Sequence, residues 1–244
     1  MEFPLHSDNP AARLLKILED GNLIQPHVNC REAWQKLLNV ERSDSALLMS
    51  RLGKVMELPD LIIKDITESY PKQSSTHTHW STTVNNGFMQ QNLNGAWKEF
   101  IAHIDSHTIS YLSMSADLLD MKSSTQLMND SDIKSIRSKA EELLNEAIDA
   151  NLDPEFKKYV VRYLKKIVSA IDEYRVSGAI PISESIECAF GHAFVDEKYR
   201  KNISTTDFGS KFVSVLGAMA SVVTIAVGLP QLPETFKYLL TASQ

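Results

Sequence analysis

The pattern of hydrophobic and polar positions is helical over most of the chain. It is clearest from Pro154 to about Val176, where apolar residues recur at alternating steps of four and three positions and so share one face of an α-helix. The residues of this stripe are Phe156, Val160, Tyr163, Ile167, Ala170 and Tyr174. Asp153 is predicted to cap this helix, with Pro154 in its first turn and Gly178 after its end.

Further helices are predicted on both sides of this one. In the first seventy residues, Asp8 or Asn9 and then Asn29 are the expected caps of two helices. A third helix covers about 43–58, and Pro59 either breaks it or begins a fourth. After residue 96, a helix, a turn at Asp105 and a new helix from about His107 are expected, followed by helices at 132–150 and 181–190.

Residues 71–95 have a different composition, rich in Ser, Thr, Asn and Gln. A linker or irregular loop is the first interpretation, and a small β-hairpin near 76–93 is the second, because Asn86-Gly87 is a strong two-residue turn signal. The chain is therefore predicted to be all-α, a multi-helix bundle. Its expected parts are an N-terminal subdomain (1–70), a polar connection (71–95), a main helical domain (96–205) and an apolar C-terminal segment (206–244).

The run from Phe212 to Leu229 contains no charged residue. Its length reaches the lower bound for a helix that spans a bilayer, whereas its Gly, Ser and Thr residues also suit a helix buried in a bundle or shared between chains. The three alternatives are thus a span, a core helix and an oligomer interface. The residues expected to contact a membrane or a partner are Phe212, Val215, Gly217, Ser221, Val222 and Ile225.

Composition narrows the function classes. The chain has 244 residues, of which 43% are hydrophobic and 23% charged, and its net charge is −6. This net charge disfavours nucleic acid as a partner, because binding to its phosphates requires an excess of clustered Lys and Arg. The two cysteines, Cys30 and Cys188, fit a reducing compartment, and the first residues lack the pattern of a secretory signal. We expect a cytoplasmic location, at the inner face of the membrane if 212–229 is a C-terminal anchor.

Two segments resemble uncharacterised bacterial helical proteins that carry an apolar C-terminal tail. They are WKEFIAHIDSHTISYLSMSADLL at 97–119 and NLDPEFKKYVVRYLKKIVSAIDEYRVSGAIPISESIECAFG at 151–191. The matching residues are packing and capping residues, so the resemblance implies an all-α fold and a bacterial or phage source. It is compatible with a role in bacterial conflict such as phage defence, and it carries over no catalytic residue.

Several histidines and a glutamate have the spacing of metal ligands. Glu99, His103 and His107 would share one face of a continuous helix and could hold a divalent metal, although a turn at Asp105 would separate them. His77 and His79 would face the same way on a strand. The competing interpretation of all these histidines is a solvated surface or a helix end.

Two other groups of residues can be interpreted either as a functional site or as ordinary structural residues. His192 follows Cys188 by four residues, which would suit a nucleophile pair. Because no residue that would orient such a pair is recognisable nearby, a small buried cysteine beside a helix-end histidine is the favoured interpretation. A basic cluster on the 154–176 helix would suit phosphate, an anionic membrane or an acidic partner. Since Glu155, Asp172 and Glu173 dilute this cluster, an ordinary solvated face is the favoured interpretation. Its residues are Lys157, Lys158, Arg162, Lys165 and Lys166.

The sequence favours a non-enzymatic helical effector or accessory protein that associates with a membrane or a like chain through 212–229. The first alternative is a soluble interaction or oligomerisation module with this helix in its core. The second is a metal- or Cys-dependent enzyme. The expected partner is a protein or a second copy of the chain, and no cofactor is expected.

Overall fold

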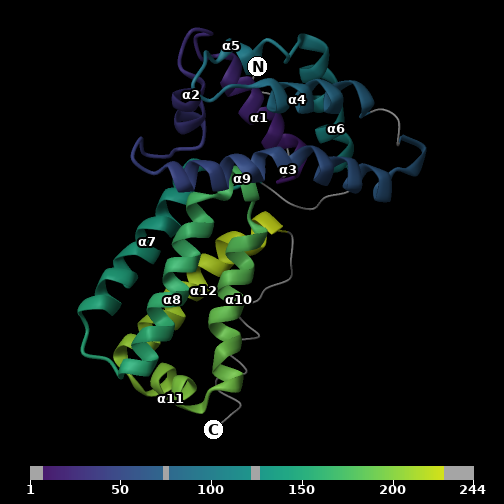
Figure 1. Cartoon of the computed structure of the whole chain (residues 1–244). Coiled ribbons are helices and arrows are strands. Elements are labelled where there is room, and N and C mark those ends of the chain that lie inside the picture. The colour runs from purple at the N-terminus through teal and green to yellow at the C-terminus, as the bar shows by residue number, and fades with distance from the viewer. Residues whose placement is uncertain (1–7, 74–76, 122–126, 228–244) are drawn as a thin grey trace. The chain divides into compact units, whose positions relative to one another are not determined.

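The computed structural model describes residues 8–73, 77–121 and 127–227, without the side chains of Ile225 and Val227. The described chain is built of twelve α-helices and one 3₁₀ turn (Figure 1). It contains no β-strand in these ranges, and its one β-bridge joins Asn29 to Ala96. The predicted all-α class is confirmed.

The chain divides into two compact units, Met1–Ser124 (unit 1) and Thr125–Gln244 (unit 2). The sequence pattern predicts boundaries near residues 70, 95 and 205, whereas the division by contacts falls between 124 and 125. The polar stretch 71–95 belongs to unit 1, and the apolar C-terminal segment belongs to unit 2.

Unit 1 begins at the predicted helix caps. The side-chain oxygen of Asn9 accepts a hydrogen bond from the amide of Ala12 at 2.8 Å, and Asn29 does the same for Arg31 at 3.0 Å. Such bonds satisfy amides that have no partner in the first turn of a helix. The elements of the unit are α1 (Pro10–Asn22), α2 (Cys30–Leu37), α3 (Ser45–Ser69), η1 (Pro71–Gln73), α4 (Thr78–Gln90), α5 (Lys98–Ile101) and α6 (Ser106–Asp120).

Helix α3 runs through Pro59 without a break. The sequence predicts a stop or a new start at this proline, because its ring removes one backbone hydrogen bond. Here Val55 and Ile62, on either side of Pro59, are both buried against the rest of unit 1. Packing of one continuous apolar face therefore outweighs the local cost of the proline.

Residues 78–90 form helix α4 rather than an irregular loop, and the β-hairpin is not confirmed. Trp80, Val84 and Phe88 follow one another at steps of four residues, and all three are buried. Helix α4 packs against α6 and α3. Burying this apolar stripe against neighbouring helices stabilises the helical conformation. The turn preference of Asn86-Gly87 is a local effect, and this packing outweighs it.

An aromatic cluster fills the centre of unit 1. Trp34 lies edge-on to Trp97 with ring centroids 5.1 Å apart, and Phe100 lies 4.9 Å from Trp34. The amide of Trp97 donates to the carbonyl of Val28 at 2.7 Å, and its indole N–H donates to the carbonyl of Gly21 at 2.9 Å. These bonds fasten the segment after α4 to the last turn of α1 and to the segment between α1 and α2.

Unit 2 is organised around the antiparallel pair of α7 (Asp130–Asp149) and α8 (Pro154–Asp172). Arg137 near the start of α7 pairs with Asp172 at the end of α8, at 2.6 Å, so the two helices run in opposite directions. The predicted cap Asp153 accepts hydrogen bonds from the first amides of α8. The remaining helices are α9 (Tyr174–Ser177), α10 (Ile180–Val195), α11 (Glu197–Thr205) and α12 (Asp207–Val227).

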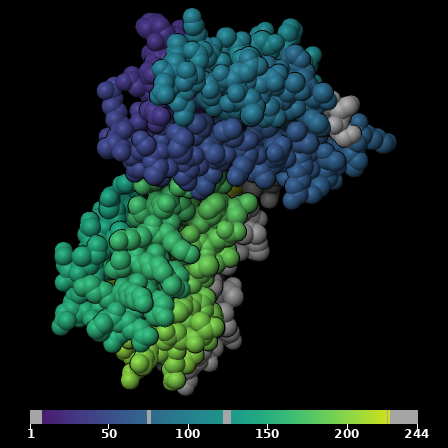
Figure 2. Space-filling model, viewed as in Figure 1, coloured from purple at the N-terminus to yellow at the C-terminus, as the bar shows by residue number. Residues whose placement is uncertain are grey.

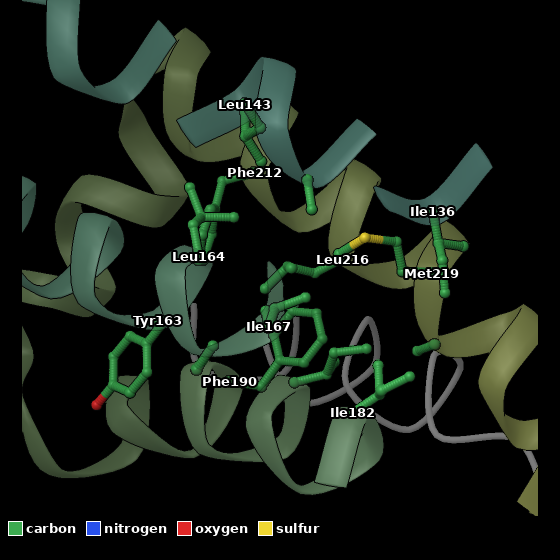
Figure 3. Close-up of a cluster of buried hydrophobic side chains, with 14 of the residues drawn as sticks. Ile136, Leu143, Tyr163, Leu164, Ile167, Ile182, Phe190, Phe212, Leu216 and Met219 are labelled. Atoms are coloured by element: carbon green, nitrogen blue, oxygen red, sulfur yellow. The ribbon is translucent and has the colours of Figure 1, made fainter. Parts of the chain in front are cut away.

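One face of α12 belongs to the core of unit 2. Phe212, Leu216, Met219 and Val223 recur at steps of three and four residues and are all 0% exposed. Figure 3 shows Phe212, Leu216 and Met219 among side chains of α7 and α8, such as Leu143 and Ile167. Helix α12 packs against α7, α10 and α11.

Gly209 permits the close approach of α12 to α11. A Cβ atom at this position would lie 2.4 Å from the carbonyl oxygen of Asn202 and 2.5 Å from that of Ile203. These neighbours are backbone atoms and cannot rotate away, so the absence of a side chain is what allows the sharp connection between the two helices.

Candidate functional site

The predicted metal ligands Glu99, His103 and His107 lie on different elements. Glu99 is in the short helix α5, where its Oε1 accepts a hydrogen bond from the amide of Ala96 at 3.4 Å. Helix α6 begins anew at Ser106, capped by Asp105, whose Oδ1 accepts from the amide of Thr108 at 2.6 Å. This bond lowers the pKa of Asp105. The turn expected at this position is confirmed, and it breaks the continuous helix that the metal site requires.

His79 and His107 approach each other across α4 and α6. Their ring centroids are 6.5 Å apart, and Nε2 of His79 lies 3.6 Å from Oδ2 of Asp105. His77 precedes α4, so the two histidines at 77 and 79 do not lie on a strand. Within the ranges that the structure describes, no group of three or more His, Cys, Asp or Glu side chains is arranged to hold a metal ion.

Cys188 and His192 lie one turn apart on α10, with different surroundings. The Cys188 thiol is free and exposed. The His192 ring packs against Tyr159 and Tyr199, with ring centroids 4.2 Å and 4.7 Å away, and its Nε2 lies 3.4 Å from Oδ2 of Asp196. The imidazole is thus part of an aromatic cluster, and no hydrogen bond among the described residues joins it to the thiol.

Cys30 is buried in unit 1 at the start of α2. Its Sγ lies 3.7 Å from Oε1 of Gln91, which also accepts the indole N–H of Trp34 at 2.7 Å. Burial, and after it the negative charge of Glu99, raise the pKa of Cys30 to about 11. Because the thiolate is the nucleophile of cysteine chemistry, this thiol is held in its unreactive form at neutral pH.

We expect the two cysteines to react at very different rates with a thiol reagent such as Ellman's reagent. In the folded protein at mildly alkaline pH, Cys188 should react rapidly, and Cys30 should react only after a denaturant has unfolded unit 1. Time courses of the wild type and of Cys188→Ser measure this difference. Rapid labelling of the folded Cys188→Ser variant would contradict it.

Helix α8 of unit 2 carries an exposed basic face. Lys158, Arg162, Lys165 and Lys166 follow one another at steps of four, three and one residues, and all four are exposed. Lys157 of the predicted cluster turns away from them, since its Nζ donates to the carbonyls of Ile148 and Ala150 and so caps α7. Figure 2 shows the green atoms of α8 and α10 at the surface of unit 2 turned towards the viewer.

The four cations of this face have no carboxylate partner among the described residues. The nearest acid along the helix, Glu155, pairs with Lys198 of α11 at 3.7 Å. Arg162 instead has Lys158 and Lys166 as neighbours four residues away on either side, and like charges at this spacing repel each other. The face therefore carries uncompensated positive charge in a chain of net charge −6.

Arg162 is held in place by two tyrosines. Its guanidinium carbon lies 5.0 Å from the ring centroid of Tyr159 and 4.9 Å from that of Tyr163. One of its terminal nitrogens, Nη2, donates a hydrogen bond to the hydroxyl of Tyr163 at 2.9 Å. Cation–π stacking and this bond restrict the rotamer of a long side chain that would otherwise be mobile.

The tyrosines under Arg162 belong to an aromatic cluster that the sequence pattern did not predict. Tyr163 is 5% exposed and Tyr199 is 1% exposed. The hydroxyl of Tyr199 donates to the carbonyl of Ala189 at 3.1 Å, and burial raises the pKa of this hydroxyl. The sequence does place Tyr159 and Tyr163 on one helix face beside Arg162, and this spacing could have indicated that the rings stack on the guanidinium. The position of Tyr199 in the cluster depends on the packing of α11 and is not visible in the sequence.

The residues expected to contact a membrane or a partner are divided between two faces of α12. Phe212 is in the core, Val215 and Val222 are half-buried against it, Gly217 is half-buried and Ser221 is exposed. The side chain of Ile225 lies outside the described residues. Among the helices that the structure describes, none is long and apolar enough to cross a membrane.

Comparisons with known proteins give no relative for this chain: no family model, no curated protein and no solved structure matches it.

Proposed function

We propose that this chain is a non-enzymatic protein-interaction module whose C-terminal helix completes its own core. The observation that supports the proposal most directly is the buried stripe of α12. Phe212, Leu216, Met219 and Val223 are removed from solvent by helices of the same unit. An anchor would need those apolar side chains for lipid, and a domain that has already buried them gains stability from them instead.

The surroundings of the cysteine and histidine side chains favour a protein-interaction module over an enzyme. Cys30 is buried with a raised pKa, and His192 packs against tyrosines. A cysteine nucleophile needs a hydrogen bond to its base, and among the described residues none joins Cys188 to His192. The exposed, uncompensated charges of α8 offer a surface for a partner.

We place the module in the cytoplasm. Both cysteines are free, and the one on α10 is exposed, as suits a reducing compartment. Attachment to the inner face of a membrane, or to a like chain through 212–229, would require α12 to leave the core. A role in phage defence has the sequence resemblance as its support and no residue of the described fold.

A matched pair of substitutions on α12 tests the proposal. Leu216→Asp places a charge in the core, whereas Ser214→Asp places the same charge on the exposed side of the same helix. We expect Leu216→Asp to abolish the cooperative unfolding of unit 2 and Ser214→Asp to leave it nearly unchanged, because an unpaired buried charge is costly. Thermal unfolding followed by circular dichroism, with near-ultraviolet spectra, provides the readout.

Fractionation of cells that express the full-length protein separates the proposal from the membrane alternative. We expect the wild type in the supernatant without detergent. If it sediments with membranes, resists a carbonate wash, and Leu216→Asp folds like the wild type, α12 is an anchor and the proposal is wrong.

A further inference from the structure

We infer that the exposed basic face of α8 binds an acidic segment of a partner protein, with Arg162 as its anchoring residue. The face consists of Lys158, Arg162, Lys165 and Lys166. This inference rests on the proposed role as an interaction module and names the surface and the chemistry of the partner.

Charge complementarity favours an acidic partner for this face. A solvated helix face usually mixes both signs, because opposite charges three or four residues apart attract each other. On this face of α8, Arg162 has cations at three, four and four residues from it, namely Lys165, Lys158 and Lys166. Carboxylates of a partner would relieve this repulsion, and they would find no competing carboxylate already paired with these four cations.

Arg162 is preorganised for binding. Its guanidinium lies over Tyr159 and Tyr163, and Nη2 is already bound to the hydroxyl of Tyr163. An arginine that is held in one orientation loses less conformational entropy when it binds a carboxylate with its remaining N–H groups. The lysines around it are flexible point charges. Arg162 is therefore suited to fix the position of one carboxylate, and the lysines to attract its neighbours.

The short length of the basic row favours a protein segment over a nucleic acid or a membrane surface. The row from Lys158 to Lys166 extends over about 12 Å at a rise of about 1.5 Å per residue, roughly two turns of helix. A long polyanion would reach beyond this row and meet a chain whose net charge is −6. A short acidic helix with carboxylates three and four residues apart matches both the length and the spacing of the row.

Fluorescence anisotropy on the full-length protein tests the inference. The probe is a labelled helical peptide of about 20 residues, long enough to form a helix, with glutamate at every third or fourth position. A second peptide has glutamine in place of each glutamate. We expect the wild type to bind the glutamate peptide and not the glutamine peptide, with an affinity that falls as salt is added.

Substitutions on α8 should weaken this binding. We expect Arg162→Gln, and separately the triple variant Lys158→Gln, Lys165→Gln, Lys166→Gln, to raise the dissociation constant by about tenfold or more. Arg162→Lys keeps the charge but removes the stacked planar group, and should also weaken binding, though less than Arg162→Gln. The control variant carries Lys134→Gln and Lys139→Gln, which remove two exposed charges from α7, and should stay within about twofold of the wild type.

Three results would overturn the inference. They are no binding of the glutamate peptide by the wild type, an equal loss in the α7 control variant, and tighter binding of duplex DNA or phosphatidylserine vesicles that the α8 substitutions abolish. The last result would assign the face to a phosphate-bearing surface instead. The peptide assay leaves α12 unaltered, so its failure is distinguishable from failure of the proposed function, which the Leu216→Asp and Ser214→Asp pair reports.

Discussion

Replacement of Trp97 by alanine should lower the free energy of unfolding of unit 1 by about 3–5 kcal/mol, the usual cost of truncating a large buried aromatic residue. The side chain is 0% exposed and lies edge-on to Trp34. It also packs so closely on α1 that a Cβ at Gly21 would lie 3.1 Å from the Trp97 ring. Since whole domains are stable by only about 5–15 kcal/mol, the loss would be a large part of the total.

Urea unfolding followed by the fluorescence of the remaining tryptophans, Trp34 and Trp80, measures this change. Trp97→Phe should cost less than Trp97→Ala, because it keeps one aromatic ring in the cluster and loses only part of the buried indole together with the hydrogen bond to the carbonyl of Gly21. Leu23→Ala is the surface control, since Leu23 is 84% exposed. Equal effects of Trp97→Ala and Leu23→Ala would show that the cluster does not stabilise unit 1.

Phe212→Ala should destabilise unit 2 by a similar amount, about 3–5 kcal/mol. Phe212 is 0% exposed and stacks with Phe208, with ring centroids 6.5 Å apart. Its removal would leave a cavity between α12 and α7, which the rigid helix pair cannot readily close. The same substitution in a membrane anchor would change partitioning and leave the soluble domain intact.

Hydrogen exchange of residues 127–227 is the appropriate measurement, because it reports protection helix by helix. We expect faster exchange throughout α7, α8 and α12 in Phe212→Ala. Ser214→Ala, on the exposed side of α12, is the control and should retain the protection of the wild type. If exchange in the Phe212→Ala variant becomes faster only within α12, this helix is not an integral part of the core.

The helix starts were predictable because a cap is a local interaction. Asn9, Asn29, Asp105 and Asp153 each accept a hydrogen bond from an amide two or three residues later, so the residue type and its position suffice to identify them. The start of α7 was predicted at 132, two residues later than its observed start at Asp130. Its cap is Asn129, whose side chain accepts a hydrogen bond from the amide of Asp132.

Other parts depended on contacts between residues far apart in the chain. Helix α4 required a partner surface for Trp80, Val84 and Phe88, and local turn propensity pointed elsewhere. The candidate site on α8 was visible as a basic cluster. Its separation from Lys157, the stacking of Arg162 on Tyr159 and Tyr163, and the approach of Tyr199 all depend on how neighbouring helices pack.

By itself the sequence determined that this protein is helical, where most of its helices begin, and that residues 212–229 form an apolar segment of ambiguous use. Only the tertiary structure decided which side of that segment is buried. Periodicity places Phe212, Leu216, Met219 and Val223 on one face of α12. Whether such a face meets lipid, another chain or its own domain depends on surfaces supplied by α7, α8 and α10, and those surfaces exist only once the helices have packed.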